Sequence, residues 1–437
     1  MKIILIHPPS DPLCHETVFG LKAPPLGLAY IASYLEERGF KPQIIDMSVC
    51  EMSTDEIRNR LERLSPDIVG VYCSITRVRQ SLDIAKIGKS LGATIVFGGP
   101  HATANYETII KNDNVDIIVL GEGEEKFARL AELIESRHSI ADIRGIVFKD
   151  NGKIEINPIA SLIPDLDVLP FPAFHLLPME SYRICDNISI ATLASSRGCS
   201  RNCKYCLVPK MYQSIWRGKS PVKVVDEMEY IHYHYKPALL LFFDECFTED
   251  LKRLEKITEE IHKRNLEIKW ASMSTGTDIS KELMIKMRKS GCLALFFGID
   301  CGVISSASNP INTMNIDIIS QTFVNSHQAG LFPIANVVFG FPGETKTDFE
   351  YLMQRTIELD PDHALFFKAV PYSEFSDEEL DKMERIAYET FYNRKSYILK
   401  HLIRSVSRVV RFQNFSIDFM WKYSKWFFKT IKTVRSF

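Results

Sequence analysis

The chain has 437 residues, 46% of them hydrophobic and 25% charged, so it can bury the cores of two ordinary domains and is neither disordered nor fibrous. Its formal net charge of -2 argues against a nucleic-acid-binding surface spread over the whole protein. No apolar stretch reaches membrane-spanning length, and the first residues lack a signal-peptide pattern, so a cytoplasmic location is expected.

The first 140 residues alternate short β-branched runs with amphipathic stretches of helical period. Runs such as Ile3–Ile6, 43–46 and 68–71 precede helical patterns such as 26–38 and 55–64. This alternation is typical of a parallel sheet covered on both faces and predicts a doubly wound, Rossmann-like domain over residues 1–145. Ligands of such sheets bind outside the carboxyl ends of the strands, where glycines let the backbone approach closely. The candidates there are Gly98, Gly99, His101, Gly121 and Glu122.

A predicted hairpin turning at Asn151–Gly152 and a proline-rich stretch form a linker over residues 146–184. A second alternating series follows over residues 185–372. Its strand candidates are 189–194, 239–243, 267–271, 294–298, 334–339 and 364–368. Six such units predict a partial (β/α)6 TIM-like barrel, three-quarters closed, with its site at the carboxyl ends of the strands.

Three cysteines crowd together directly after the first strand of this second series. Cys199, Cys203 and Cys206 lie in a segment that reads SRGCSRNCKYC, and thiolates are the usual ligands of iron–sulfur clusters. A fourth cysteine is missing nearby, which would leave one iron open to bind a substrate or cosubstrate. The alternative is a zinc knuckle with a distant fourth ligand, which is less favoured because no second pair of ligands is visible.

This segment resembles the signature of the radical S-adenosylmethionine superfamily, and the resemblance runs over most of residues 185–370. It implies a four-iron four-sulfur cluster whose open iron chelates S-adenosylmethionine, and reductive cleavage to a 5'-deoxyadenosyl radical. It also implies that Tyr205, before the third cysteine, lies by the adenine. A reductase, flavodoxin or ferredoxin would then donate the electron.

Three further segments are similar to the family pattern. Asp244 and Glu245 stand in the acidic motif near the methionine ammonium, a role that suits carboxylates facing a fixed cation, although helix capping by Asp244 or Thr248 is an alternative. Asp300 stands at a strand end where the family commonly has Glu. Gly340 lies in the loop that would close beside the adenine and ribose.

The first domain resembles the cobalamin-binding domain joined to many of these enzymes, and its glycine loops would then cradle the corrin edge and nucleotide tail. The sequence Asp-x-His-x-x-Gly, which supplies a histidine to cobalt, is not present there. We therefore do not assign His7 or His101 to cobalt. A lone histidine is more often a hydrogen-bonded structural residue.

Together the two cofactors imply methylation of an unactivated carbon of a small-molecule or lipid substrate, with the protein supplying orientation and exclusion of water. Radical cyclisation or rearrangement without net methylation is one alternative. An iron–sulfur or cobalamin sensor without turnover is a second, and an RNA-modifying enzyme a third. One departure from the family stands after Ala369–Tyr372, where Pro-Gly-Thr and some tens of residues are missing. The substrate class is therefore not inherited from the family.

Residues 373–437 are predicted to be helical and basic. Residues His401 to Phe437 include eight Lys or Arg, a single acidic residue, Asp418, and many aromatic residues. Such a helix can lie in a membrane interface or along nucleic acid, or it can pack on the barrel with its lysines in water. The first possibility predicts peripheral membrane contact through residues 401–437; no nucleic-acid partner is expected.

Overall fold

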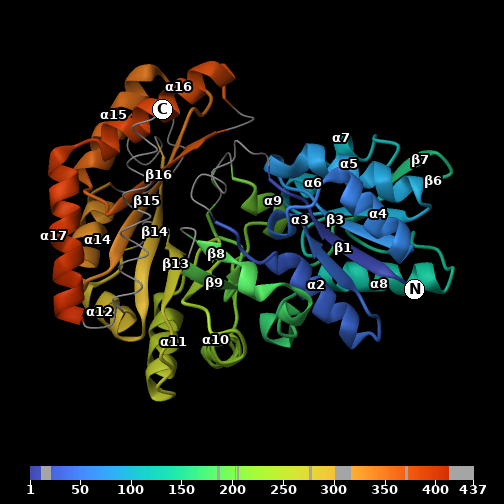
Figure 1. Cartoon of the computed structure of the whole chain (residues 1–437), viewed down its shortest axis with the longest axis horizontal. Coiled ribbons are helices and arrows are strands. Elements are labelled where there is room, and N and C mark those ends of the chain that lie inside the picture. Colours follow the sequence, from blue (N-terminus) through green and yellow to red (C-terminus); the bar gives the residue numbers. More distant parts are fainter. Residues whose placement is uncertain are drawn as a thin grey trace. The chain divides into compact units, whose positions relative to one another are not determined.

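The computed structural model describes residues 1–10, 21–184, 188–201, 203, 206–274, 278–300, 316–369 and 373–412 (Figure 1). The chain divides into two compact units. Unit 1 comprises residues 1–183, 196–202 and 206–219, and unit 2 comprises 184–195, 203–205 and 220–437. The chain thus changes unit several times around the cysteine segment.

Unit 1 is built on a seven-stranded sheet in the order β2-β1-β3-β4-β5-β6-β7. The first five strands are parallel, and β6 and β7 add an antiparallel hairpin at one edge. The strands are β1 (Ile3–His7), β2 (Gln43–Asp46), β3 (Ile68–Tyr72), β4 (Thr94–Gly98), β5 (Ile117–Val119), β6 (Ile146–Asp150) and β7 (Lys153–Ile156). The predicted doubly wound fold is therefore confirmed.

Helices cover both faces of this sheet. They are α2 (Leu26–Glu37), α3 (Met47–Cys50), α4 (Thr54–Leu64), α5 (Val78–Ser90), α6 (Pro100–Ala104), α7 (Tyr106–Ile109) and α8 (Glu124–Glu135). Successive strand residues point to opposite faces, so Val69 and Val71 join the core with residues of α4 and α5, whereas Gly70 lies against Phe127 of α8. On these two faces α4 packs on α5 and α2 packs on α8. Continuous apolar strands are what a sheet buried on both sides requires.

Short elements follow the sheet in the sequence. They are the 3-10 turns η2 (Leu166–Val168), η3 (Phe174–Leu176) and η4 (Met179–Ser181), with the antiparallel pair β10 (Ser196–Arg197) and β11 (Arg217–Gly218), and α9 (Val208–Tyr212). The predicted linker thus includes three turns, and their side chains Leu166, Phe174 and Met179 are buried.

Unit 2 is built on a curled seven-stranded sheet in the order β16-β15-β14-β13-β12-β9-β8. Its strands are β8 (Arg183–Ile184), β9 (Ile188–Leu193), β12 (Leu239–Phe242), β13 (Trp270–Ser274), β14 (Cys292–Asp300), β15 (Phe332–Phe339) and β16 (His363–Lys368). From β9 to β16 neighbouring strands are parallel. The predicted partial barrel is confirmed.

The helices between and after these strands are α10 (Pro221–Tyr235), α11 (Leu251–Lys263), α12 (Lys281–Lys289), α14 (Ile316–Ala329), α15 (Lys346–Glu358), α16 (Asp377–Tyr392) and α17 (Lys395–Phe412). An aromatic core of Phe242, Phe247 and Trp270 anchors the base of this unit, with ring centroids 4.6 to 5.6 Å apart. Among the described residues no helix is long and apolar enough to cross a bilayer.

Two local predictions differ from the structure. The strand expected over 267–271 runs instead from Trp270 to Ser274, because Ser272 and Ser274 are buried in it and Ser274 shares a hydrogen bond of 3.0 Å with Thr248. Helix α11 is capped by Asp250, whose side chain accepts from the Arg253 amide, and not by Asp244 or Thr248. Residues 413–437 of the predicted basic tail lie outside the described residues.

Candidate functional site

The cysteine segment begins in a tight antiparallel ribbon. Arg197 of β10 pairs with Arg217 of β11, and the next residue, Gly198, adopts φ +84°. A Cβ at Gly198 would collide with the carbonyl oxygen of Ile215, so only glycine fits this turn. The backbone therefore enters the first cysteine, Cys199, on a fixed course.

The three cysteines differ in exposure. Cys199 is buried, Cys203 is half-buried and Cys206 is exposed. Three thiols within eight residues form a donor set that suits an iron–sulfur cluster with one iron left open. Tyr205, the predicted adenine contact, lies outside the described residues.

Thiol reactivity is expected to follow this exposure. Burial raises the pKa of the Cys73 thiol to about 11, and it raises the pKa of fully buried Cys292 further still. Thiolates are the reactive species, so buried Cys73 and Cys292 should resist iodoacetamide at pH 8 while exposed Cys206 reacts. The extent of alkylation at each cysteine of the native, cluster-free protein is measured by peptide mass spectrometry. Labelling of Cys73 as fast as Cys206 would contradict the described packing.

Asp244 locks the ends of two neighbouring strands of unit 2. Its Oδ1 accepts a 2.8 Å bond from the Ser195 amide and its Oδ2 accepts a 2.6 Å bond from the Ser195 hydroxyl. Arg253 of α11 donates to the Ser195 carbonyl oxygen at 2.5 Å. Asp244 is buried, and through its two hydrogen bonds to Ser195 its carboxylate holds the chain that leads from β9 into the cysteine segment. The next residue, Glu245, is half-buried at the end of β12.

The ends of β14 and β15 carry the other predicted residues of the second domain. Asp300 ends β14, and its side chain lies outside the described part. Gly340 follows β15 with φ +85°, and its amide donates a 2.6 Å bond to Glu344 Oε2. The positive φ favours glycine at this position, and a Cβ there would also displace the Leu380 side chain of α16, whose Cδ2 would lie 2.6 Å away.

In unit 1 the strand order places a crevice between β1 and β3. Chain connections leave β1 and β3 in opposite directions there, and ligands of open parallel sheets bind at such a point. The loop after β3 contains Ser74, Thr76 and Arg77. Arg77 is buried and donates from Nε to the Pro8 carbonyl oxygen at 2.9 Å and from Nη1 to Ser74 and Thr76 at 3.4 and 3.3 Å. A single guanidinium thereby joins the loops after both strands.

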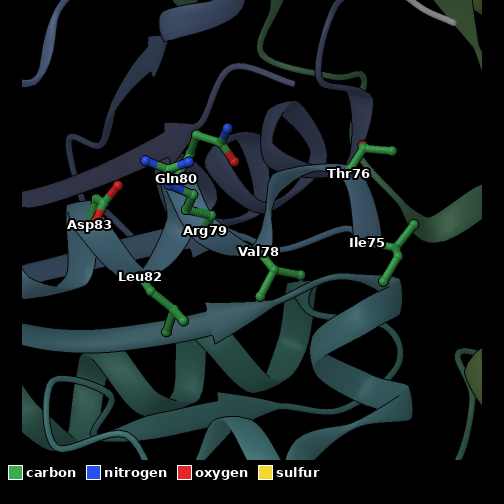
Figure 2. Close-up of a pocket in the computed structure, with 7 residues that line it drawn as sticks. All are labelled: Ile75, Thr76, Val78, Arg79, Gln80, Leu82 and Asp83. Carbon is green, nitrogen blue, oxygen red and sulfur yellow. The ribbon is translucent and has the colours of Figure 1, made fainter. Parts of the chain in front are cut away.

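A pocket of about 480 Å³ opens beside this loop and along α5. Figure 2 shows Ile75 and Thr76 on the loop and Val78, Arg79, Leu82 and Asp83 along the helix. This loop was not predicted as part of the site, because the prediction rested on glycines at the strand ends. The hydroxyl residues directly after the third strand were the available signal, since strand order is not readable from the sequence.

The predicted glycine loops lie at the same edge. Gly99 has φ +104°, and a Cβ there would lie 2.9 Å from the Cys73 carbonyl oxygen. The Gly121 amide donates a 3.0 Å bond to the Thr103 hydroxyl. His101 contacts Asn105 at 3.2 Å, and burial lowers its pKa below the usual value. Gly99 and Gly121 therefore pack against backbone of unit 1, at Cys73 and Met211, whereas a Cβ at Gly98 would meet only the Val119 carbonyl oxygen, at 4.0 Å.

The Glu122 carboxylate, by contrast, is engaged by hydrogen bonds within unit 1. It is 7% exposed and accepts from Arg197, Arg217 and the Ile163 amide. Burial raises its pKa, but the Arg197 charge and the arginine hydrogen bonds outweigh burial and leave the pKa below its usual value. The carboxylate is therefore a structural anion within unit 1.

A second buried carboxylate, Asp46, lies at the end of β2. It accepts from Tyr182 at 2.9 Å, pairs with His7 Nδ1 at 2.9 Å, and receives the Ser48 amide and hydroxyl. The His7 ring therefore has a hydrogen-bonded partner, as expected for a lone histidine. Burial alone would raise the pKa of Asp46, but His7, Ser48 and Tyr182 lower it below its usual value.

This carboxylate predicts an acid-sensitive step in stability. A lowered folded-state pKa means that ionised Asp46 stabilises unit 1 above about pH 4 and that this stability is lost as the pH falls through the folded-state value. Asp46→Asn should cost about 1–3 kcal/mol at pH 7 and flatten the loss of stability below pH 4. Thermal unfolding followed by circular dichroism from pH 7 to pH 3 measures both effects. Equal slopes in wild type and variant would contradict the assignment.

Comparison with known proteins assigns the two parts of the chain. The model of the B12 binding domain matches residues 16–131, and that of the Radical SAM superfamily matches residues 193–356. An uncharacterised methyltransferase of Pyrococcus horikoshii is 28% identical over 450 residues, 94% of this chain and 96% of the relative. The anaerobic magnesium-protoporphyrin IX monomethyl ester cyclase of Rubrivivax gelatinosus is 27% identical over 413 residues, 92% of this chain and 74% of the relative.

A solved structure shares the fold. The radical S-adenosylmethionine methyltransferase TsrM of Kitasatospora setae, with cobalamin and an iron–sulfur cluster bound, superposes with a TM-score of 0.68 at 17% identity. The match covers 84% of this chain and 72% of that one.

Proposed function

Because this chain is a radical S-adenosylmethionine enzyme with a cobalamin-binding domain, we propose that it methylates an unactivated carbon of a small-molecule or lipid substrate. The observation that carries the proposal is the succession of the two domains in one chain, together with the nearly full-length similarity to a methyltransferase. Its cofactors are a four-iron four-sulfur cluster, S-adenosylmethionine and cobalamin. An enzyme of this class also needs a substrate and a reductant.

When bound, the reduced cluster cleaves S-adenosylmethionine to a carbon-centred radical, and cobalamin carries the methyl group. The residues of this chain bind and orient. Cys199, Cys203 and Cys206 hold the cluster through three thiolates and leave one coordination position open. Asp244 holds Ser195 and so fixes the strand end from which the cysteine segment departs. Glu245 is then the carboxylate proposed to face the methionine ammonium.

In unit 1 the proposed approach of a flat macrocycle to the sheet edge is at Gly98, where a Cβ would meet only the Val119 carbonyl oxygen, at 4.0 Å; Gly99 and Gly121 are proposed to shape the neighbouring loops. The loop after β3, fixed by Arg77, offers the hydroxyls of Ser74 and Thr76 at the crevice between β1 and β3. A flavodoxin, ferredoxin or dedicated reductase is the proposed electron donor. No nucleic-acid partner is proposed.

The test uses the reaction products. The full chain is reconstituted anaerobically with iron and sulfide, with or without hydroxocobalamin, reduced with titanium(III) citrate and given S-adenosylmethionine. Transfer of a methyl group from S-adenosylmethionine to cobalamin leaves S-adenosylhomocysteine, whereas radical formation leaves 5'-deoxyadenosine. Both products, with S-adenosylhomocysteine formed only when cobalamin is present, are expected. Only 5'-deoxyadenosine would support the cyclisation or rearrangement alternative, which the similarity to a ring-closing relative favours. If neither product forms, the result supports the alternative that the protein is a sensor without turnover.

We further propose that α17 brings the enzyme to an anionic lipid surface. Leu399 and Ile403, one helical turn apart, are 61% and 60% exposed. The same helix has no acidic residue; its Lys395 is exposed, whereas Lys400 and Arg404 pair with Asp360. An exposed apolar ridge beside cations is the pattern of an interfacial helix.

The lipid proposal is tested by flotation. The full chain should float with vesicles of phosphatidylcholine and phosphatidylglycerol at 3:1 and not with phosphatidylcholine alone. Leu399→Ser with Ile403→Ser should reduce flotation several-fold, whereas Ile386→Ser on α16 should not. Flotation of all three proteins to the same extent, or of none, would refute the role of α17.

A further inference from the structure

The cysteine segment is joined to the first domain by a buried cluster of four charges, here called the arginine clamp: Glu122, Glu124, Arg197 and Arg217. All four belong to unit 1. The two glutamates come from the loop after β5 and the start of α8, and the two arginines from the β10–β11 ribbon. The clamp therefore connects the glycine loop of the cobalamin-binding domain with Arg197, which stands two residues before Cys199.

The geometry of the clamp is a double fork. Arg197 donates from Nη1 to Glu122 Oε1 at 2.9 Å and from Nη2 to Glu124 Oε1 at 2.6 Å. Arg217 donates to both oxygens of Glu122, at 3.0 and 3.1 Å, and to the Ile163 carbonyl oxygen. Planar guanidinium forks fix direction as well as distance, which an ammonium cannot do.

The surroundings hold Arg197 on its remaining side. Its guanidinium lies over the Tyr30 ring of α2, 5.2 Å from the centroid, and Lys219 lies 5.0 Å from the same centroid while donating to the Tyr30 hydroxyl at 2.7 Å. Side chains of Arg197 and Lys219 are both buried. Gly198, which can bear no side chain, is the one residue between this arginine and Cys199. The position of Arg197 is therefore fixed by its side chain two residues before the first cysteine.

The clamp is a costly way to achieve stability alone. Desolvating four charges offsets much of their attraction, and apolar residues of similar volume often stabilise equally well. The clamp also leaves Glu124 Oε2 and Arg217 Nε buried and without a hydrogen-bond partner among the described residues. What the ion pairs supply, and apolar packing cannot, is a single direction for the chain entering Cys199.

We propose that Arg197 is a positioning residue that ties the geometry of the cluster-binding segment to the Gly121–Glu124 loop of the cobalamin-binding domain. This inference rests on the proposed function, because it assumes a cluster on Cys199. It assigns Glu122 and Glu124 to the support of the cluster segment rather than to direct contact with a cofactor.

The test compares Arg197→Lys with Arg264→Lys. Arg264 is a matched control because it also bridges carboxylates, those of Asp226, Glu229 and Glu260, but its half-buried side chain lies just after α11 and away from the cysteine segment in the sequence. Each full-length protein is reconstituted anaerobically with iron and sulfide, and the reduced protein is titrated with S-adenosylmethionine while its electron paramagnetic resonance is recorded. Iron content and retention of hydroxocobalamin through gel filtration are measured alongside.

Arg197→Lys is expected to retain its iron but to require about tenfold more S-adenosylmethionine for the spectral change, with a broadened signal, since small displacements of reacting groups have large effects. Arg264→Lys should match the wild type. Should Arg197→Lys fail to fold, Glu124→Gln, which keeps the side-chain shape and Glu122 intact, replaces it with the same expectation. If the variant that folds gives the same S-adenosylmethionine titration as the wild type, the positioning role of Arg197 is overturned and the proposed function is unaffected. A wild type that binds no cluster overturns the proposed function and this inference with it.

Discussion

Replacement of any one of Cys199, Cys203 and Cys206 by serine is expected to abolish the iron–sulfur absorbance of the reconstituted protein. Formation of 5'-deoxyadenosine should fall by about a thousandfold or more, because no residual pathway reduces S-adenosylmethionine once the cluster is lost. The fold should survive, since a cysteine to serine change removes no packing volume at exposed Cys206 and little at half-buried Cys203. Ultraviolet–visible spectra, iron analysis and product chromatography measure these effects.

Cys50→Ser is the matched control, because Cys50 is an exposed cysteine at the end of α3. It should keep full absorbance and activity. Cluster absorbance retained in all three variants would refute the ligand assignment. Bound zinc in place of iron in the wild type, with tetrahedral coordination, would return the three cysteines to a structural metal site.

Gly198→Ala is expected to prevent cluster assembly while leaving most of the fold in place. The residue has φ +84°, which costs an L-residue about 1–2 kcal/mol. The new Cβ would in addition collide with the Ile215 carbonyl oxygen across the ribbon. Backbone at that carbonyl cannot give way without breaking the β10–β11 pairing, so the cysteine segment must be displaced. Iron content per chain after reconstitution is the measurement.

Gly39→Ala separates the effect of the positive φ from that of the collision with the Ile215 carbonyl oxygen. Gly39 also has φ +84°, but a Cβ there meets nothing within 4 Å. This variant should lose about 1 kcal/mol of unfolding free energy and bind a full complement of iron. Equal iron content in the two variants would show that the close approach at Ile215 is without consequence for the site.

The sequence predicted the elements well where their hydrophobic period was strong. Strand 43–46 was placed at its observed ends, and helices 26–38 and 55–64 were placed within one residue of theirs. The strand at Trp270–Ser274 was misplaced because buried serines read as loop residues. A serine can be buried when its hydroxyl finds a partner, and such a partner is visible only in three dimensions.

The candidate site was predicted in part. Cysteine spacing is a local pattern, so the proposed ligands could be named from the sequence alone, and they stay predictions until iron is measured. Arg77, Arg197 and Arg217 were not singled out, because the partners that join them to other segments lie between 54 and 95 positions away in the chain. Nothing in a single sequence distinguishes a buried arginine from a solvated one. The domain boundaries also stay a prediction.

The repeated change of unit around residue 200 bears on how such chains can be rearranged. Residues 196–202 and 206–219 belong to the compact unit formed by the first 183 residues, although the family match that contains them begins at residue 193. A fragment cut at the end of the first sheet would remove Glu122 and Glu124 from the arginines that they neutralise. A chimera that exchanges the amino-terminal domain must therefore carry the β10–β11 ribbon with it, so that both glutamates and both arginines come from the same parent.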